Sequence, residues 1–149
     1  MADAEIPSDW SQVAADIMVS KYFRKAGING DPKRGERSAR ELVYRVARTI
    51  REAGEKLGGY FATLADADAF EAELSFVLVH QHAAFNSPVW FNCGLYHRYG
   101  ITGSGGNYAW DPATDSIIET KNAYEHPQCS ACFIQRVSDD LMSIYDLVK

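Results

Sequence analysis

Two cysteines three positions apart, Cys129 and Cys132, are the residues of this chain best suited to chemistry. In thioredoxin-like redox sites such a pair opens a helix, whose dipole lowers the pKa of the first thiol and whose turn brings the two sulfurs within bonding reach. Here the pair is followed by strand-forming residues that alternate between apolar and polar. The pattern therefore predicts a strand from Cys132 to Val137, with Cys132 at its mouth.

This predicted strand limits which sulfur could pair with Cys132. Residues three apart on an extended segment lie about 10 Å apart at roughly 3.3 Å per residue, whereas a disulfide needs Cα atoms within about 7 Å. Cys129 is therefore a poor partner, and a partner elsewhere in the fold or beyond this chain is expected. Structural packing, the commonest role of a free cysteine, is the alternative for Cys132 and the interpretation for Cys129 and Cys93.

A zinc site is the alternative chemistry for these cysteines. Cys93 and His97 form one closely spaced pair and Cys129 with Cys132 another, which makes four plausible ligands. Against zinc, 31 residues separate the pairs, and the second pair enters a predicted strand instead of a tight knuckle. The alternative function is a zinc-stabilised binding module, and a third is a helical interaction domain with inert cysteines.

The composition is that of an ordinary globular protein. The chain has 149 residues, 46% of them hydrophobic, and a formal net charge of −5. This charge disfavours nucleic acid and anionic membranes as partners, because both are bound by clustered Lys and Arg. The first five residues do not resemble a secretory signal, and no apolar run approaches the roughly 18 residues of a membrane span. A cytoplasmic protein is expected.

Three helices are predicted before residue 86. The first starts at Pro7-Ser8-Asp9 and ends near Gly27. Ser38 and Glu41 form a capping box that opens the second, which Gly58-Gly59 stops. The third starts at Asp66 or Asp68 and ends at Ser87, because Pro88 disfavours helical geometry in the residue before it and should begin a short extended segment.

The remaining residues are predicted to be less regular. A long Gly-, Asn- and Asp-rich loop should run from Tyr96 to His126. After the strand, Ser138-Asp139-Asp140 should supply the N-cap and first turn of a last helix. The buried face of that helix should consist of Leu141, Ile144, Tyr145 and Val148. A chain that ends inside such a helix is expected to be the front part of something larger.

Several short motifs, taken in order, resemble one protein family. They are Phe85-Asn86-Ser87-Pro88-Val89-Trp90-Phe91-Asn92, then Gln128-Cys129-Ser130-Ala131-Cys132-Phe133-Ile134, then Asp139-Asp140-Leu141-Met142-Ser143-Ile144. The leading segments Asp9–Gln12 and Ser20–Gly27 fit the same pattern. Together they resemble the N-terminal region of class II, adenosylcobalamin-dependent ribonucleotide reductases, over essentially the whole chain.

The resemblance implies a fold and a reaction. Residues 1–85 would form a mainly helical N-terminal region. Residues 86–149 would begin a ten-stranded α/β barrel with a substrate loop, the Gly-rich loop, the first strand and its following helix. The complete enzyme would convert ribonucleotides to 2′-deoxyribonucleotides by thiyl-radical chemistry, and adenosylcobalamin would be bound mainly outside this chain. Cys132 would be one of two reducing thiols, its partner lying on a later strand, so this segment alone should be inactive.

The resemblance also implies binding residues and partners. Ser87, Ala131 and Cys132 would contact the ribonucleotide, and Asp139 would belong to a site for a deoxynucleotide or ATP effector. A thioredoxin-type reductant and the remainder of the polypeptide would be partners; a metal site is not implied, and the choice between di- and triphosphate stays open. The competing interpretations are a turn residue for Ser87 and, for Asp139, an acidic residue that stabilises a helix N-terminus by about 0.3–1 kcal/mol.

Overall fold

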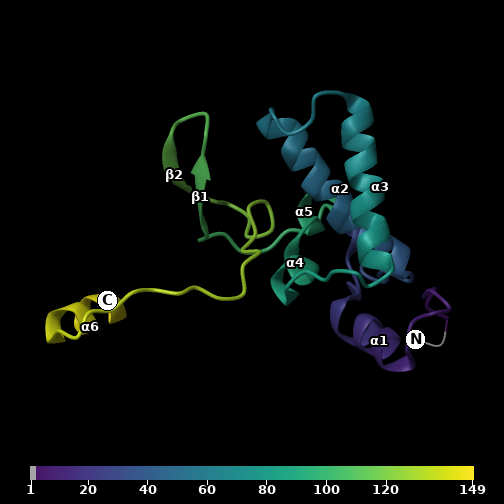
Figure 1. Ribbon diagram of the computed structural model, residues 1–149, viewed down its shortest axis with the longest axis horizontal. Coiled ribbons are helices and arrows are strands. Elements are labelled where there is room, and N and C mark those ends of the chain that lie inside the picture. The colour runs from purple at the N-terminus through teal and green to yellow at the C-terminus, as the bar shows by residue number, and fades with distance from the viewer. Residues whose placement is uncertain (1–2) are drawn as a thin grey trace.

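A computed structural model describes residues 3–149, so the first two residues of the expected helical region 1–85 lie outside the described residues. The chain is mainly helical, with one small sheet (Figure 1). None of the helices described between residues 3 and 149 combines the length and apolar composition needed to cross a bilayer. The element order is α1 (Gln12–Ile17), η1 (Met18–Tyr22), η2 (Ile28–Gly30), α2 (Ala39–Leu57), α3 (Leu64–Val79), α4 (Ser87–Asn92), α5 (Leu95–Tyr99), β1 (Tyr108–Asp111), β2 (Ser116–Glu119) and α6 (Leu141–Val148).

Helices α2 and α3 pack side by side, as Figure 1 shows. The predicted capping box is confirmed: the Ser38 hydroxyl accepts from the Glu41 N–H at 3.0 Å, and the Glu41 carboxylate accepts from the Ser38 N–H at 3.3 Å. The helix ends at Leu57, as the following glycines predict. Ion pairs from Arg48 and Arg51 of α2 to Glu71 of α3, at 3.0 and 2.8 Å, join the two helices.

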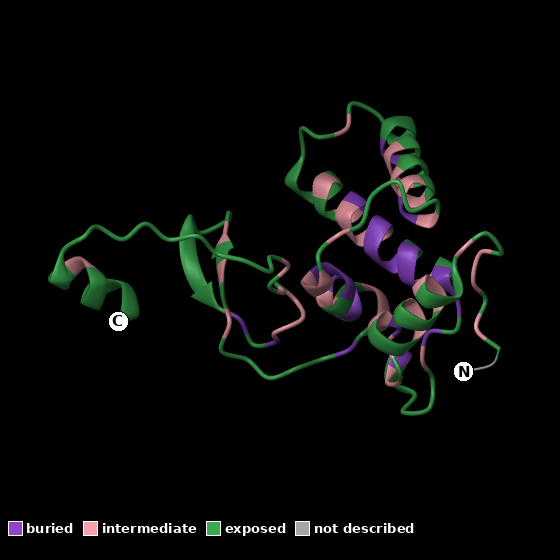
Figure 2. Cartoon of the chain, turned by 60° about the horizontal axis from the view of Figure 1, so that its bottom comes forward, coloured by how far each residue is buried: buried purple, intermediate pink, exposed green. Residues whose placement is uncertain are grey.

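The hydrophobic core lies where α2, α3 and α4 meet. Burial is concentrated along α2, as Figure 2 shows. The buried cluster combines residues from four parts of the chain: Phe23, Leu42, Val43, Val46, Leu78, Val89, Trp90 and Cys93. The core therefore holds α4 against the two long helices.

The first helix is shorter than predicted. Its N-cap is Ser11, whose hydroxyl accepts from the Ala14 N–H at 3.2 Å, and not the Pro7-Ser8-Asp9 segment. The π-helix η1 continues α1 as far as Tyr22, and Phe23 is extended. The predicted continuation of the helix to Gly27 is therefore wrong. The cause is tertiary: Phe23 turns into the core, where its side chain is buried.

The boundaries of the third helix also differ from the prediction. It begins at Leu64 because its N-cap, Thr63, forms a capping box with Asp66. Asp66 therefore lies inside the first turn and does not start the helix. It ends at Val79. The segment from Ser87 is the short helix α4 and not extended, because Pro88 lies in its first turn, where a missing N–H costs nothing.

The expected loop from Tyr96 to His126 contains the end of a helix and a β-hairpin. Helix α5 extends to Tyr99, and β1 pairs with β2 as an antiparallel hairpin in which Trp110 lies opposite Ile117. Of the residues described, the hairpin strands are the ones that pair as a sheet. The ten-stranded barrel therefore stays an expectation from the resemblance.

The strand predicted from Cys132 to Val137 is absent. These residues form an exposed, irregular segment that leads to α6, at the far end of the molecule in Figure 1. A strand needs a neighbour for its backbone hydrogen bonds, and the described residues supply none here. Helix α6 does form, capped by Asp140, whose carboxylate accepts from the Ser143 N–H at 2.9 Å. Its predicted buried face is exposed, up to 81% at Val148.

Candidate functional site

Two asparagines at the ends of α4 hold the cysteine segment in place. The Asn92 amide donates to the Gln128 carbonyl at 3.0 Å. The side-chain nitrogen of Asn86 donates to the Cys129 carbonyl at 2.9 Å, and its side-chain oxygen accepts from the Ala131 N–H at 3.2 Å. This is the amide orientation that satisfies both neighbours. The two motifs that stand far apart in the sequence, one around Ser87 and one around Cys132, are thereby brought together.

A buried arginine fixes the C-terminal end of α4. The Arg45 guanidinium donates to the carbonyls of Trp90, at 3.0 Å, and of Cys93. These carbonyls lie at the end of the helix, where no following turn can satisfy them. Arg45 also donates to the Glu36 carboxylate at 2.9 Å, and both side chains are at most 1% exposed. The cysteine segment is therefore supported through α4 by the core.

Glu36 completes this buried polar cluster. Its carboxylate accepts from the Tyr99 hydroxyl at 2.8 Å and from the Arg24 N–H at 2.7 Å. Burial, and next the negative charge of Glu36, raise the pKa of Tyr99, so its hydroxyl keeps its proton and donates. The cluster thus ties α2, α5 and the loop before α2 into one unit.

A glycine allows α5 to approach α2 closely. Gly94 has φ +80°, and a Cβ there would lie 2.6 Å from Thr49 Oγ1 and 2.7 Å from Arg45 Cγ. A larger residue would therefore push α5, and with it the end of α4, away from Arg45.

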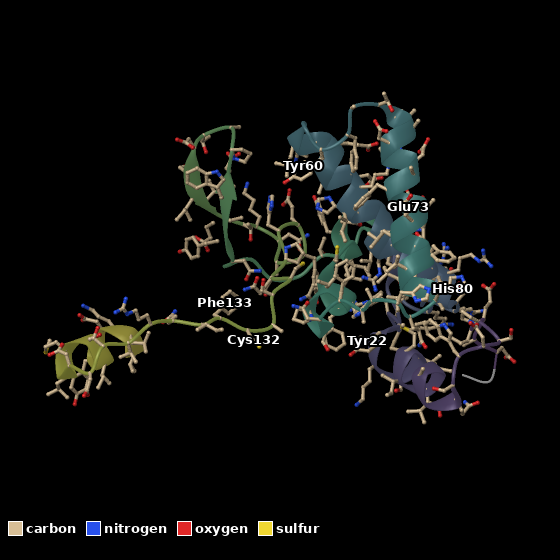
Figure 3. All side chains as sticks on the ribbon, in the orientation of Figure 1. Tyr22, Tyr60, Glu73, His80, Cys132 and Phe133 are labelled. Carbon is tan, nitrogen blue, oxygen red and sulfur yellow. The ribbon has the colours of Figure 1, made fainter. Side chains whose placement is uncertain are left out.

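Ser87 lies in the first turn of α4 and is half-buried. Its hydroxyl is 3.0 Å from the Tyr22 hydroxyl. The Tyr22 ring, labelled in Figure 3, packs against Phe91 with centroids 5.2 Å apart. The Ser87 hydroxyl is therefore held in position by Tyr22, next to Asn86.

The other predicted site residues are exposed. Cys132 is a free thiol on the segment between the hairpin and α6, as Figure 3 shows, and Ala131 beside it is also exposed. Asp139 is exposed too and directly precedes the cap residue Asp140, so it lies outside the helix that it was expected to begin. The structure brings Ser87 toward Ala131 through Asn86, and it does not bring Asp139 to them.

An interaction between Cys93 and Cys129 was not predicted from their spacing in the sequence. The Cys93 thiol lowers the pKa of Cys129 to about 7, against the opposing effect of burial. The same interaction, together with burial, raises the pKa of Cys93, so Cys93 keeps its proton. Both cysteines line a cavity of about 880 Å³ between α2, α5 and the hairpin.

The zinc alternative is not supported by the arrangement of its four ligands. In the described part of the chain, no three His, Cys, Asp or Glu side chains come together as a metal site. Cys93 is buried and Cys129 half-buried, but Cys132 is exposed, and His97 Nε2 lies 2.9 Å from the Glu125 carbonyl.

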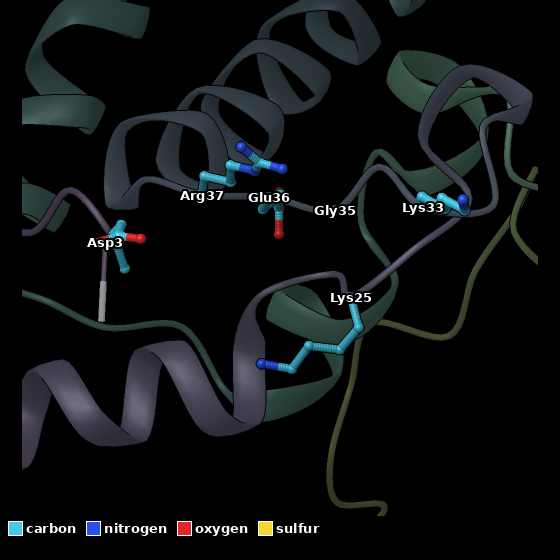
Figure 4. Close-up of a pocket in the computed structure, with 7 residues that line it drawn as sticks. Asp3, Lys25, Lys33, Gly35, Glu36 and Arg37 are labelled. Carbon is cyan, nitrogen blue, oxygen red and sulfur yellow. The ribbon is translucent and has the colours of Figure 1, made fainter. Parts of the chain in front are cut away.

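A second cavity, of about 370 Å³, lies beside the loop that precedes α2. Lys25, Lys33 and Arg37 line it, yet Figure 4 shows their side chains on separate segments and not converging on one point.

Comparison with known proteins identifies relatives of the chain. Residues 1–81 match the family described as class II vitamin B12-dependent ribonucleotide reductase. A curated vitamin B12-dependent ribonucleotide reductase of Rhodopirellula baltica is 46% identical over 148 residues, covering 97% of this chain and 14% of the relative. Proteins of the same name from Bradyrhizobium diazoefficiens and Streptomyces avermitilis are each 41% identical, over 95% and 97% of this chain and 14% and 12% of their own length. The chain therefore spans about one seventh of these relatives.

Proposed function

The chain belongs to the class II vitamin B12-dependent ribonucleotide reductase family, within its N-terminal region, and we propose that it supplies part of the substrate site of such an enzyme. The complete polypeptide would convert ribonucleotides to 2′-deoxyribonucleotides by thiyl-radical chemistry. One observation carries the proposal: the asparagines at both ends of α4 join the segment of Ser87 to the segment of Cys132.

Cys132 would be one of the two thiols that reduce the substrate. Its exposure leaves it free to meet both a nucleotide and a second cysteine from a part of the polypeptide outside this chain. A neutral thiol can protonate the departing 2′-hydroxyl, which leaves as water. The two sulfurs then form a disulfide and give up the two electrons that reduce the ribose, and a thioredoxin-type dithiol restores them. Cys129 packs against the hydrophobic core and would not take this role.

Ser87 and Ala131 would contact the nucleotide. The Ser87 hydroxyl is held by Tyr22 at a fixed position and can donate to a phosphate oxygen. The small side chain of Ala131 leaves space beside Cys132 for a ribose. Asp139 would belong to a separate site for a deoxynucleotide or ATP effector, consistent with its distance from the Ser87 segment along the exposed chain.

The described residues do not fit the cobalamin cofactor. The cavity beside Cys93, about 880 Å³, has the size of pockets that hold drug-sized ligands, about 300–1,000 Å³, and adenosylcobalamin is considerably larger. We therefore assign cofactor binding to parts of the polypeptide outside this chain, and no step above depends on its geometry.

Replacement of Cys132 tests the proposal in the complete enzyme. Cys132→Ser should abolish multiple turnover with a thiol reductant and leave substrate binding largely intact. Cys129→Ser, assayed with the same reductant, is the matched control and should keep turning over. Normal turnover of the Cys132→Ser enzyme would refute the assignment, and lost turnover in the control would show that the other sulfur is the reducing thiol.

A further inference from the structure

We propose that Tyr22 is a positioning residue of the nucleotide site, which acts by directing the hydroxyl proton of Ser87 toward the substrate. The two hydroxyl oxygens are 3.0 Å apart and partly buried, although 65 residues separate them in the sequence. Tyr22 lies in the leading helical segment, outside the predicted site residues. It would have this role only if Ser87 contacts the nucleotide, so the inference rests on the proposed function.

The ring of Tyr22 is fixed against the helix that carries Ser87. Tyr22, labelled in Figure 3, ends the π-helix η1, which packs on α4. Its ring centroid is 5.2 Å from that of Phe91 and 6.3 Å from that of Trp90, and both are residues of α4. The next residue, Phe23, is buried in the core. The Tyr22 hydroxyl is therefore held by the ring contacts and by the backbone that follows.

An unusual helical turn directs Tyr22 toward α4. The Phe23 N–H donates to the Met18 carbonyl at 3.1 Å, five residues back, so the turn contains one residue more than an α-helical turn. One residue corresponds to a rotation of about 100° around an α-helix. The π-helical turn thus determines the face on which Tyr22 lies. Such turns are rare and occur frequently at functional sites.

Nucleotide binding would select one direction for the hydrogen bond between the two hydroxyls. Each hydroxyl has one proton to donate and two lone pairs that accept. Ionised phosphate oxygens only accept, so a Ser87 hydroxyl that donates to phosphate has no proton left for Tyr22. The bond at 3.0 Å then persists only with Tyr22 as its donor. A hydroxyl that accepts a hydrogen bond is polarised into a stronger donor, so Tyr22 would strengthen the contact from Ser87 to phosphate.

A structural role is the alternative for Tyr22, because its ring also packs η1 against α4. Tyr22→Phe separates the two roles, since it removes the hydroxyl and keeps the ring. A role in packing belongs to the ring and would survive this substitution. A role that acts through Ser87 belongs to the hydroxyl and would be lost.

The test is a double-mutant cycle in the complete enzyme, assayed with whichever of CDP and CTP it reduces. Tyr22→Phe should raise KM about 3- to 10-fold, the effect of one net hydrogen bond, and leave kcat little changed. Ser87→Ala should raise KM more, roughly 10-fold or above, because it removes a hydrogen bond to a charged group. In the Ser87→Ala enzyme, Tyr22→Phe should have no further effect. In Ser87→Thr, which keeps a hydroxyl, it should again raise KM.

The matched control removes a tyrosine hydroxyl outside the site. Tyr44→Phe deletes the acceptor of an Arg98 hydrogen bond at 3.3 Å and should leave KM unchanged. Unchanged KM in Tyr22→Phe beside a raised KM in Ser87→Ala would overturn the role of Tyr22 and leave the proposed function standing. Equal increases from Tyr22→Phe with and without Ser87 would also overturn it, because Tyr22 would then act independently. Unchanged KM in Ser87→Ala would remove the proposed contact of Ser87 with the nucleotide, and the role of Tyr22 with it.

Discussion

The guanidinium of Arg45 and the carboxylate of Glu36 form an ion pair at 2.9 Å with at most 1% of either side chain exposed. Removing one member of a buried pair leaves the other charge without compensation, which costs about 3–5 kcal/mol. We therefore expect Glu36→Gln to lower the free energy of unfolding by about 3 kcal/mol, measured by urea denaturation.

The matched control is the same substitution in an exposed pair. Glu5 contacts Arg40 at 3.1 Å, with the side chains 60% and 81% exposed. Such pairs contribute about 0–1 kcal/mol, so Glu5→Gln should change stability by no more than that. Equal losses in the two variants would show that the Glu36 pair is not the support of α4 that the structure indicates.

Two glycines with positive φ allow the energetic cost of backbone strain to be measured separately from the cost of a steric clash. Gly94 has φ +80° and Gly100 φ +63°, but a Cβ would meet Arg45 and Thr49 only at Gly94. Gly100→Ala should cost about 1–2 kcal/mol for the left-handed conformation alone. Gly94→Ala should cost a further 1–3 kcal/mol, roughly, from the clash. Thermal unfolding of the two variants measures the difference, and similar midpoints would refute the close approach of α5 to α2.

Hydrogen exchange tests the clamp on the cysteine segment. The Ala131 N–H donates to the Asn86 side chain at 3.2 Å, so Asn86→Ala should speed exchange at that amide. Asn92→Ala is the control, because Asn92 donates to the Gln128 carbonyl and leaves the Ala131 N–H bonded. Unchanged exchange at Ala131 in Asn86→Ala would mean that this clamp does not form in solution.

The reactivity of Cys129 should follow a low pKa. The bond from Cys93 lowers the pKa of Cys129 from 9.0 to about 7, so its alkylation rate should reach half-maximum near pH 7 and fall as the thiolate is protonated below it. Cys93→Ala removes the donor and should move this midpoint up toward 9.0. Cys93→Ser retains a donor and should keep much of the shift. A midpoint that is the same in all three chains would argue against the bond.

Helix starts could be predicted where the signal is local. Ser38 and Glu41 satisfy each other within one turn, so their sequence spacing alone defined the start of α2. The same signal at Thr63 and Asp66 marks the start of α3. Asp66 and Asp68 are themselves possible N-caps, which is why the start was predicted too late. Pro88 permitted two outcomes, an extended segment or a first helical turn, and burial of Val89 and Trp90 in the core favoured the helix.

Features that depend on distant residues could not be predicted from spacing. The alternation after Cys132 is a strand pattern, yet a strand requires a partner that the described residues lack. The position of Cys129 against the core depends on hydrogen bonds from Asn86 and Asn92, which no periodicity reveals. Arg45 appears in the sequence as one of several arginines in an amphipathic helix, and only the fold distinguishes it as buried.

The hydrogen bond from Asn92 to Gln128 spans 36 residues, and this separation has a consequence for biosynthesis. Every buried member of the main core, from Phe23 to Cys93, is translated more than 30 residues before Gln128, roughly the length of that span. Because chains fold from the N-terminal end as they are made, we expect this core to close first and to shield Cys93 while Cys129 is still untranslated. The cysteine segment should therefore dock last, onto a core in which Cys93 is already buried.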